Sequence, residues 1–248
     1  MFALQSFPPY PLLKSAVTTV PLPSNLPKPV HRFFTKIFGD QVPVIDSAIV
    51  SGKGSIRVKG ITFPARWRFV YCAGLGYRHY IEAAILGHPL LKVNEYYLDG
   101  HSRLELPFGV VENEPKVDMA ANLGLWGESI WFPSIFLTDA RVHWQAIDDT
   151  TAHLIVPFGN MTDTFTATFD PQTGLLQQFE SLRYREATDT QKIGWCNQVL
   201  NWQTFNGMLL PSHAAVRWLD DTTAWFVLNV EEVIYNIDVA EYIRTKGI

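Results

Sequence analysis

The chain has 248 residues, of which 47% are hydrophobic and 18% are charged, and its net charge at pH 7 is −4. A chain of this length buries roughly 70 to 75% of the surface that its unfolded form exposes, so a full hydrophobic core is available. The acidic balance and the absence of a basic run argue against nucleic acid as a partner.

The amino-terminal segment is rich in proline, with Pro8, Pro9 and Pro11 near its start. Proline disfavours regular helices and central strands, so we expect an extended arm over residues 1–29 that packs across a single domain formed by residues 30–248. The same prolines interrupt any apolar run, which argues against a signal peptide and an integral membrane segment. We therefore expect a cytoplasmic protein.

A short helix is predicted directly after this arm, over residues 30–38. Pro29 suits the first helical position, and Gly39 suits a helix end. From Val42 onward the chain is a long series of strand-like segments separated by turn residues, and Asp99-Gly100 is a strong hairpin signal. About a dozen strands at this spacing, with no alternation of strands and helices, predict an antiparallel sheet.

The strand pattern is interrupted once, by an apolar helix predicted over residues 118–132. Asp118 is placed to cap its start, and Pro133 is placed to end it. Both faces of this helix are apolar, and Glu128 is the single charge in its body, so protein should surround it. The predicted fold is mainly β: a large curved antiparallel sheet, or half-barrel, wrapped around this central helix. The two faces consist of Met119, Leu123, Trp126 and Ile130, and of Leu125, Trp131 and Phe132.

The order of several motifs resembles an uncharacterised, mostly bacterial family that carries only a domain-of-unknown-function label. The most specific motif is Glu-x-x-Trp-Phe-Pro, which spans Glu128 to Pro133, and Trp144 follows it in VHWQAIDDTTA. The resemblance implies a fold similar to the half-barrel of the periplasmic lipoprotein carriers and related lipid-binding lipoproteins. Members usually carry arginine and then tyrosine where this chain has Gly124 and Leu125, so Glu128 lacks its expected arginine partner here.

Glu128 is therefore the first candidate for catalysis. A carboxyl group buried among aromatic rings without a cation would hold its proton near neutrality, as a general acid requires. The alternative is a structural ion pair between Glu128 and an arginine of the sheet. The candidates for that arginine are Arg66, Arg68, Arg141 and Arg183.

A second candidate pair, Asp99 and His101, flanks the hairpin glycine. An aspartate beside a histidine can hold the imidazole in one tautomer as a general base, although the aspartate also has a plain turn function here. The seven histidines and two cysteines show no metal-binding spacing, and no phosphate-binding loop is present, so we expect neither a metal nor a cofactor. Cys72 and Cys196 are expected to be free, buried thiols, with a disulfide as the alternative.

Aromatic residues supply the remaining functional signal, since they make up 13% of the chain. They either fill the core of a large sheet or line an apolar pocket. Two functions follow. The first is binding of a hydrophobic small molecule or lipid in an aromatic-lined cavity. The alternative is a cofactor-independent isomerase, cyclase or lyase that uses Glu128 in general acid/base catalysis. The oligomeric state stays open. The candidate ligand-binding residues are Trp67, Tyr97, Trp126, Trp131, Phe132, Trp144, Tyr184, Trp202 and Trp218.

Overall fold

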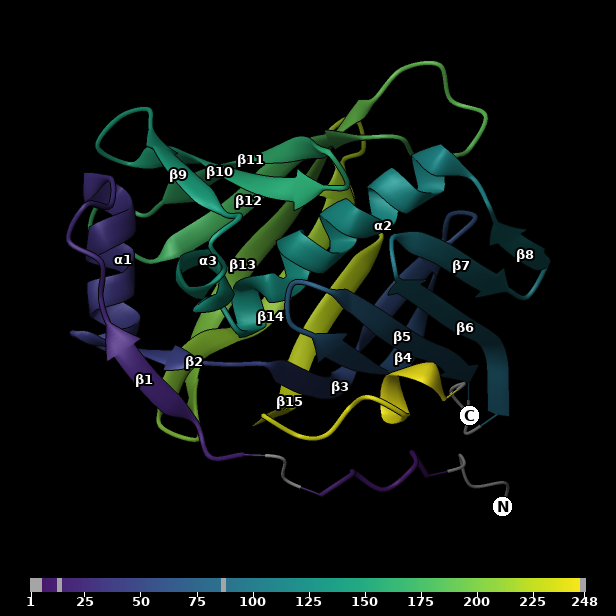
Figure 1. The fold of residues 1–248 in the computed structure, drawn as a ribbon. Coiled ribbons are helices and arrows are strands. Elements are labelled where there is room, and N and C mark those ends of the chain that lie inside the picture. The colour runs from purple at the N-terminus through teal and green to yellow at the C-terminus, as the bar shows by residue number, and fades with distance from the viewer. Residues whose placement is uncertain (1–5, 13–14, 86–87, 246–248) are drawn as a thin grey trace.

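The computed structural model describes residues 6–12, 15–85 and 88–245. Thirteen strands form one antiparallel sheet, and a short two-stranded sheet joins β1 (Thr18–Pro21) to β2 (Gln41–Val44). The large sheet consists of two consecutive meanders (Figure 1). The first contains β3 (Ser47–Val58), β4 (Ile61–Cys72), β5 (Gly76–Ile85), β6 (His88–Leu98), β7 (His101–Leu106) and β8 (Gly109–Glu112). The second contains β9 (His143–Ala146), β10 (Thr151–Phe158), β11 (Met161–Phe169), β12 (Leu176–Arg183), β13 (Ile193–Phe205), β14 (Met208–Trp218) and β15 (Phe226–Tyr235).

The two meanders join where β15 pairs with β3. Glycine is required at this seam because the strands approach closely: a Cβ atom at Gly54 would lie 1.8 Å from the carbonyl oxygen of Val227, and one at Gly52 would lie 2.0 Å from that of Asn229. With β3 and β15 at the centre, β8 and β9 become the two edges of the sheet. The mainly β, antiparallel fold predicted from the sequence is confirmed.

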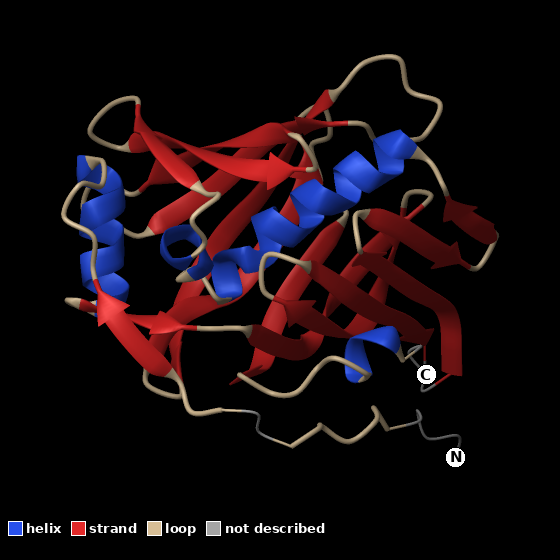
Figure 2. Ribbon diagram, viewed as in Figure 1, coloured by secondary structure: helices blue, strands red, loops and turns tan. Residues whose placement is uncertain are grey.

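The central helix α2 (Pro115–Glu128) connects those two edges. It starts directly after β8, continues into the 3₁₀ helix η1 (Ser129–Trp131) and the short helix α3 (Ile135–Thr138), and leads to β9. Figure 2 shows it lying inside the curve of the sheet. Every residue from Ala120 to Gly127 is buried, as expected for a helix that is apolar on all sides.

The helix boundaries differ from the prediction at both ends. Pro115 occupies the first turn and Glu114 precedes it, so Asp118 lies inside the helix and is not its cap. Instead, the Asp118 carboxylate accepts hydrogen bonds from the backbone N–H (2.7 Å) and hydroxyl (2.6 Å) of Ser102 on β7. Asp118 therefore ties the start of α2 to the first meander. At the other end, the helix tightens into η1 before Pro133 is reached.

Helix α1 (Lys28–Phe38) contains the predicted segment and ends with the N–H of Gly39 donating to the carbonyl oxygen of Thr35. Its buried face holds Val30, Phe33 and Phe34, and it covers one end of the curled sheet (Figure 1). Trp144 and Trp202 pack against this helix, with ring centroids 6.3 Å from Phe34 and 5.9 Å from Phe33.

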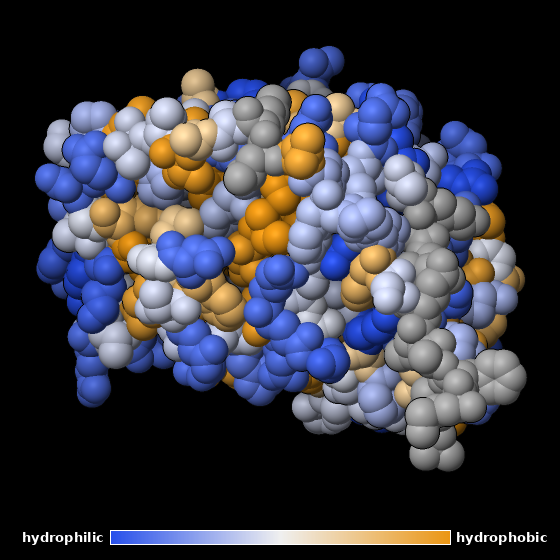
Figure 3. Space-filling model, turned by 90° about the horizontal axis from the view of Figure 1, so that it is seen from below, coloured by the Kyte–Doolittle hydropathy of each residue, from blue (hydrophilic) through white to orange (hydrophobic). Residues whose placement is uncertain are grey.

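The segment before α1 runs along the outside of the sheet. There the guanidinium of Arg68 lies 4.4 Å from the ring centre of Phe7 and 4.3 Å from that of Tyr10. The 3₁₀ helix η2 (Tyr242–Arg244) lies beside this contact, where the Tyr242 hydroxyl accepts a hydrogen bond from Arg68. Figure 3 views the molecule from this side, where hydrophobic side chains gather between polar margins. The division into an arm over 1–29 and a domain over 30–248 stays a prediction.

The two cysteines are not joined by a disulfide: Cys196 is buried as expected, whereas Cys72 is half-buried. No helix among the described residues is long and apolar enough to span a membrane.

Candidate ligand-binding cavity

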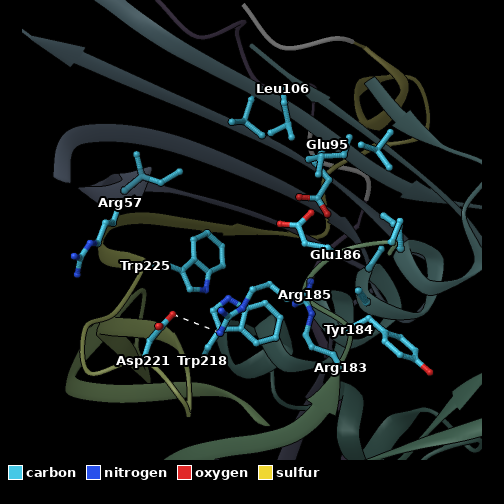
Figure 4. Close-up of a pocket in the computed structure, with 18 of the residues that line it drawn as sticks. Arg57, Glu95, Leu106, Arg183, Tyr184, Arg185, Glu186, Trp218, Asp221 and Trp225 are labelled. Carbon is cyan, nitrogen blue, oxygen red and sulfur yellow. Dashed lines mark ion pairs between the residues drawn. The ribbon is translucent and has the colours of Figure 1, made fainter. Parts of the chain in front are cut away.

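A cavity of about 870 Å³ lies between the first half of α2 and the inner face of the sheet (Figure 4). This volume is within the range of roughly 300 to 1,000 Å³ that is typical of small-molecule sites. On the helix side, Ala120 and Ala121 face the space, and their small side chains leave room that larger residues would fill. Strands β3, β5, β6, β7 and β8 supply one wall, and the ends of β12 and β14 with the connections after them supply the other.

Most of the cavity wall is apolar. The aliphatic part comes mainly from five strands and the helix, and Trp218 and Trp225 add two indole rings. Such a surface favours an apolar ligand because burying apolar area releases roughly 25 cal/mol per Å². The apolar lining residues are Ile56, Ile81, Val93, Leu104, Leu106, Val111, Val117, Ala120, Ala121, Ala187, Trp218 and Trp225.

Charged side chains also line the cavity, and bases outnumber acids. Arg185 pairs with Asp220 (2.5 Å) and Asp221 (3.5 Å), and the second pair is visible in Figure 4. Lys116 donates to the backbone oxygen of Asp189 at 2.6 Å. These cations therefore already have partners. The full charged set is Arg57, Lys59, Lys116, Arg183 and Arg185, with Glu95, Glu186 and Asp221.

Arg183, at the end of β12, has a different environment. Its guanidinium lies 4.6 Å from the ring centre of Trp195 and 5.5 Å from that of Trp218, and burial lowers its pKa below the usual range. The largest electrostatic effect that raises the pKa of Arg183 comes from Glu95, followed by Tyr77 and Glu128. Over the described part of the chain, Arg183 makes no hydrogen bond and no ion pair within 4.0 Å, and its Nε is buried without an acceptor.

Glu128, the acid highlighted by the sequence, lies behind this cavity at the end of α2. Its side chain is 15% exposed, and its Oε2 accepts a hydrogen bond from the Tyr71 hydroxyl at 2.9 Å. The same oxygen lies 2.8 Å from the Nε2 of His79 on β5, at ion-pair distance but without the alignment of a hydrogen bond. The expected arginine partner is thus replaced by an imidazole and a phenol.

His79 links Glu128 to a second carboxylate. Its ring is stacked between Phe69 and Tyr77, with centroids 3.9 Å away on each side. Its Nδ1 lies 4.0 Å from Glu95, which also accepts a hydrogen bond from the Tyr77 hydroxyl. Burial, followed by the neighbouring carboxylates, raises the pKa values of Tyr71 and Tyr77 well above the usual value, so both phenols stay protonated donors. Of this cluster, Glu95 is the member that lines the cavity.

Three of the four arginines proposed as partners of Glu128 have other polar contacts, and the fourth, Arg183, interacts with Glu128 electrostatically without forming an ion pair. Arg66 pairs with Glu82, and Arg141 pairs with Asp139. Arg68 donates to Ser51 and to the N-terminal segment on the outer face. The expected structural ion pair with an arginine is therefore absent from the described residues, and His79 takes that place.

Asp99 and His101 lie away from both the cavity and Glu128. The hairpin prediction is confirmed, since Asp99 and Gly100 connect β6 to β7 with positive φ angles of 54° and 84°. The side chains are 81% and 77% exposed, and each has a separate partner: Asp99 lies 3.6 Å from Arg244, and His101 lies 3.6 Å from Asp118. The aspartate and histidine thus do not form the acid/base dyad expected from their spacing.

The nine aromatic candidates divide into three groups by position. Tyr184 and Trp218 line the cavity, whereas Trp144 and Trp202 pack near α1. The others are buried in the core, where Trp67 stacks on Trp131 with centroids 5.8 Å apart and Trp131 Nε1 donates to the Pro211 oxygen at 3.2 Å. The core group is Trp67, Tyr97, Trp126, Trp131 and Phe132.

Sequence reasoning missed three residues at this site: His79, Glu95 and Trp225. His79 had a usable signal, because Tyr77, His79 and Ile81 share one face of a strand and both neighbours are apolar or aromatic. Glu95 and Trp225 had none, since their positions depend on how distant strands curl together. In the described ranges, no group of three or more histidine, cysteine, aspartate or glutamate side chains could hold a metal ion.

Comparisons with known proteins agree with this geometry at the level of fold. A family model described as "Family of unknown function (DUF6544)" matches residues 15–229. No match is found among curated proteins. A solved structure of a LolA-superfamily protein from Nitrosomonas europaea is similar with a TM-score of 0.52 and 10% sequence identity, covering 88% of this chain and 96% of that one. A DUF1329-family protein from Desulfovibrio piger has a TM-score of 0.46 and 9% identity, covering 80% and 89%.

Proposed function

We propose that this chain, which belongs to the family of unknown function DUF6544, binds a hydrophobic small molecule or lipid in the cavity under α2. The observation that carries the proposal is the cavity itself: about 870 Å³ of space bounded by the alanines of α2, the aliphatic residues of five strands and two tryptophans. The lipid-binding half-barrels that the sequence resembles are in keeping with such a role. The proposed location is cytoplasmic.

Binding can be tested with Nile red, an uncharged hydrophobic dye whose emission rises in apolar surroundings. The wild-type protein should bind the dye saturably. Val117→Trp should weaken binding because a large ring at this lining position would occupy part of the cavity. The matched control is Leu200→Trp, which places the same ring at an exposed position of β13 outside the cavity lining.

The two variants separate cavity binding from adsorption to the surface. Loss of dye binding in Val117→Trp with retention in Leu200→Trp supports the proposal. Equal binding by both variants, with unchanged thermal unfolding, would place the dye elsewhere and contradict it.

The second candidate function is a cofactor-independent isomerase, cyclase or lyase. The observation in its favour is the position of Glu128 beside His79, with 2.8 Å between Oε2 and Nε2, since a carboxyl group and an imidazole are the side chains most used in general acid/base catalysis. Glu128 would reach a ligand only through the cluster, because Glu95 is the member at the cavity wall. This position makes binding the better-supported function.

Turnover can be tested by mass spectrometry of a metabolite extract incubated with wild-type protein and with Glu128→Gln. Conversion of one compound by the wild type alone would favour the enzyme. Equal retention of an unchanged apolar compound by both proteins would favour the binder.

A further inference from the structure

Among the described cations of the cavity wall, Arg183 is half-buried and has neither a hydrogen bond nor an ion pair, whereas Arg57 and Lys59 are exposed to solvent. Arg183 rests on the rings of Trp195 and Trp218, and over the described residues its guanidinium has neither a hydrogen-bond acceptor nor a carboxylate within 4.0 Å. A guanidinium removed from water is costly unless it is paired, and contact with aromatic faces offsets only part of that cost. A bound anion would therefore supply the negative charge and the hydrogen-bond acceptor that Arg183 lacks.

The buried polar atoms of the described cavity lining that have no partner are all hydrogen-bond donors. The Nε atoms of Arg183 and Arg185 and the Nε1 of Trp225 are buried without a partner, and all three are donors from lining residues. Buried donors are normally satisfied, so the wall on this side has a deficit of acceptors. An acceptor group on a ligand would fit this deficit, whereas a cationic or donor group would increase it.

Glu95, the acid with the largest electrostatic effect on Arg183, already has two partners of its own. Glu95 accepts the Tyr77 hydroxyl and lies 4.0 Å from the Nδ1 of His79, so its charge is directed into the buried cluster. Arg185 is likewise neutralised by Asp220 and Asp221. These pairings leave Arg183 as the half-buried lining cation whose guanidinium is available to bind an anion.

The apolar part of the cavity adjoins this cation. Val117 and Ala120 of α2 and Ile81 of β5 line the same space, so a ligand with its acidic group at Arg183 would lay its apolar portion under the helix. We infer that the ligand is an anionic amphiphile, in which a carboxylate or phosphate head pairs with Arg183 and a hydrocarbon portion fills the space beneath α2. This inference rests on the proposed binding function and adds the chemical class of the ligand.

The test compares three molecules with the same hydrocarbon chain and different heads: dodecanoic acid, dodecanol and dodecyltrimethylammonium. Each is titrated below its micelle concentration by displacement of Nile red. The acid should bind about 10-fold or more tightly than the alcohol, because a hydrogen bond to a charged group contributes about 1.5 to 3 kcal/mol. The ammonium compound should bind most weakly. Dodecyl phosphate then distinguishes a phosphate head from a carboxylate head.

Variants locate the effect at one residue. Arg183→Gln should weaken acid binding about 10-fold and leave alcohol binding within about 3-fold of the wild type. Arg183→Lys keeps the charge and should restore much of the preference. Arg217→Gln is the matched control, because Arg217 precedes Trp218 on β14 but does not line the cavity. Thermal unfolding of each variant establishes that it is folded.

The outcomes distinguish the two proposals. Equal affinity of the wild type for acid and alcohol would overturn the anionic head group while leaving hydrophobic binding intact. A preference for the acid that survives in Arg183→Gln would overturn the assignment to Arg183. Failure of the wild type to bind any of the three chains would overturn the proposed function itself.

Discussion

The Nε2 of His79 lies 2.8 Å from the Oε2 of Glu128, so the acid at the end of the central helix meets an imidazole from β5. The hydroxyl of Tyr71 approaches the same oxygen at 2.9 Å. Both partners belong to the first meander, and Glu128 ends the helix that crosses the sheet. The contact therefore fixes the end of α2 against strands β4 and β5.

Replacing Glu128 with glutamine should reduce stability and spare ligand binding. The amide can still accept from Tyr71 but carries no charge to attract His79, so the free energy of unfolding should fall by about 1 to 3 kcal/mol. The measurement is urea unfolding at neutral pH. Glu231→Gln is the control, because its exposed pair with Lys53 should contribute less than about 1 kcal/mol. Equal losses in the two variants would contradict a structural role for the Glu128 contact.

Asp163 should make the protein less stable as the pH rises. Burial raises the pKa of Asp163 above its usual value, and the Nδ2 of Asn122 lies 3.2 Å from its carboxylate. A raised pKa means that the folded state binds the proton more tightly, so stability falls between the unfolded pKa of about 3.9 and the higher folded pKa.

Asp163→Asn mimics the protonated acid and should escape this loss. The variant should be more stable than the wild type near neutral pH, and its advantage should vanish in acid below the unfolded pKa. Thermal unfolding across this range is the measurement. A stability advantage of Asp163→Asn that increased as the pH fell would contradict a raised pKa of Asp163 in the folded protein.

Cys196 should resist alkylation in the folded protein. Burial raises the pKa of its thiol to about 12, so almost none of it is thiolate at about pH 8.5, where an ordinary cysteine is half ionised. Iodoacetamide followed by peptide mass spectrometry should find Cys196 unmodified in buffer and modified in urea. Rapid labelling of Cys196 in the folded protein would contradict the burial of this strand.

Two glycines should respond in opposite ways to alanine. In Gly54→Ala the new Cβ would meet the Val227 carbonyl oxygen at 1.8 Å, so the seam between β3 and β15 should open and the protein should lose several kcal/mol or fail to fold. In Gly124→Ala the nearest atom is the Tyr77 hydroxyl at 3.5 Å, an ordinary contact. That change should stabilise the helix by roughly 0.5 to 1 kcal/mol. Comparing the two unfolding temperatures tests the asymmetry.

The pattern of apolar residues along the sequence predicted the strands and helices of this fold. The partners of the side chains at the candidate site depend on tertiary contacts instead. Alternating apolar residues identified the strands, and the two apolar faces identified α2, because each pattern depends on burial within one element. Asp118 shows the limit: its residue type suits a cap, but the chain enters the helix earlier, at Pro115, and Asp118 binds Ser102 instead. The partner of Glu128 was missed because it depends on which distant strand the helix end meets.

The sequence predicts an aromatic-lined cavity, but the apolar lining is mainly aliphatic, and only Trp218 and Tyr184 of the nine aromatic candidates belong to it. Trp67 and Trp131 stack on each other in the core instead. Trp67 and Trp218 each follow an arginine on a strand, so the local sequence does not separate a core ring from a lining ring. The curvature of the sheet makes that distinction.

Binding of an apolar ligand under α2 is tested most directly by the indole N–H signals of the tryptophans in nuclear magnetic resonance spectra, assigned with Trp→Phe variants. Dodecanol, which carries no charge, is titrated into the wild-type protein. Binding in the cavity predicts that the signals of Trp218 and Trp225 shift saturably while those of Trp67 and Trp131 stay in place. Saturating shifts that spare Trp218 and Trp225, or no shifts at any concentration, would contradict it.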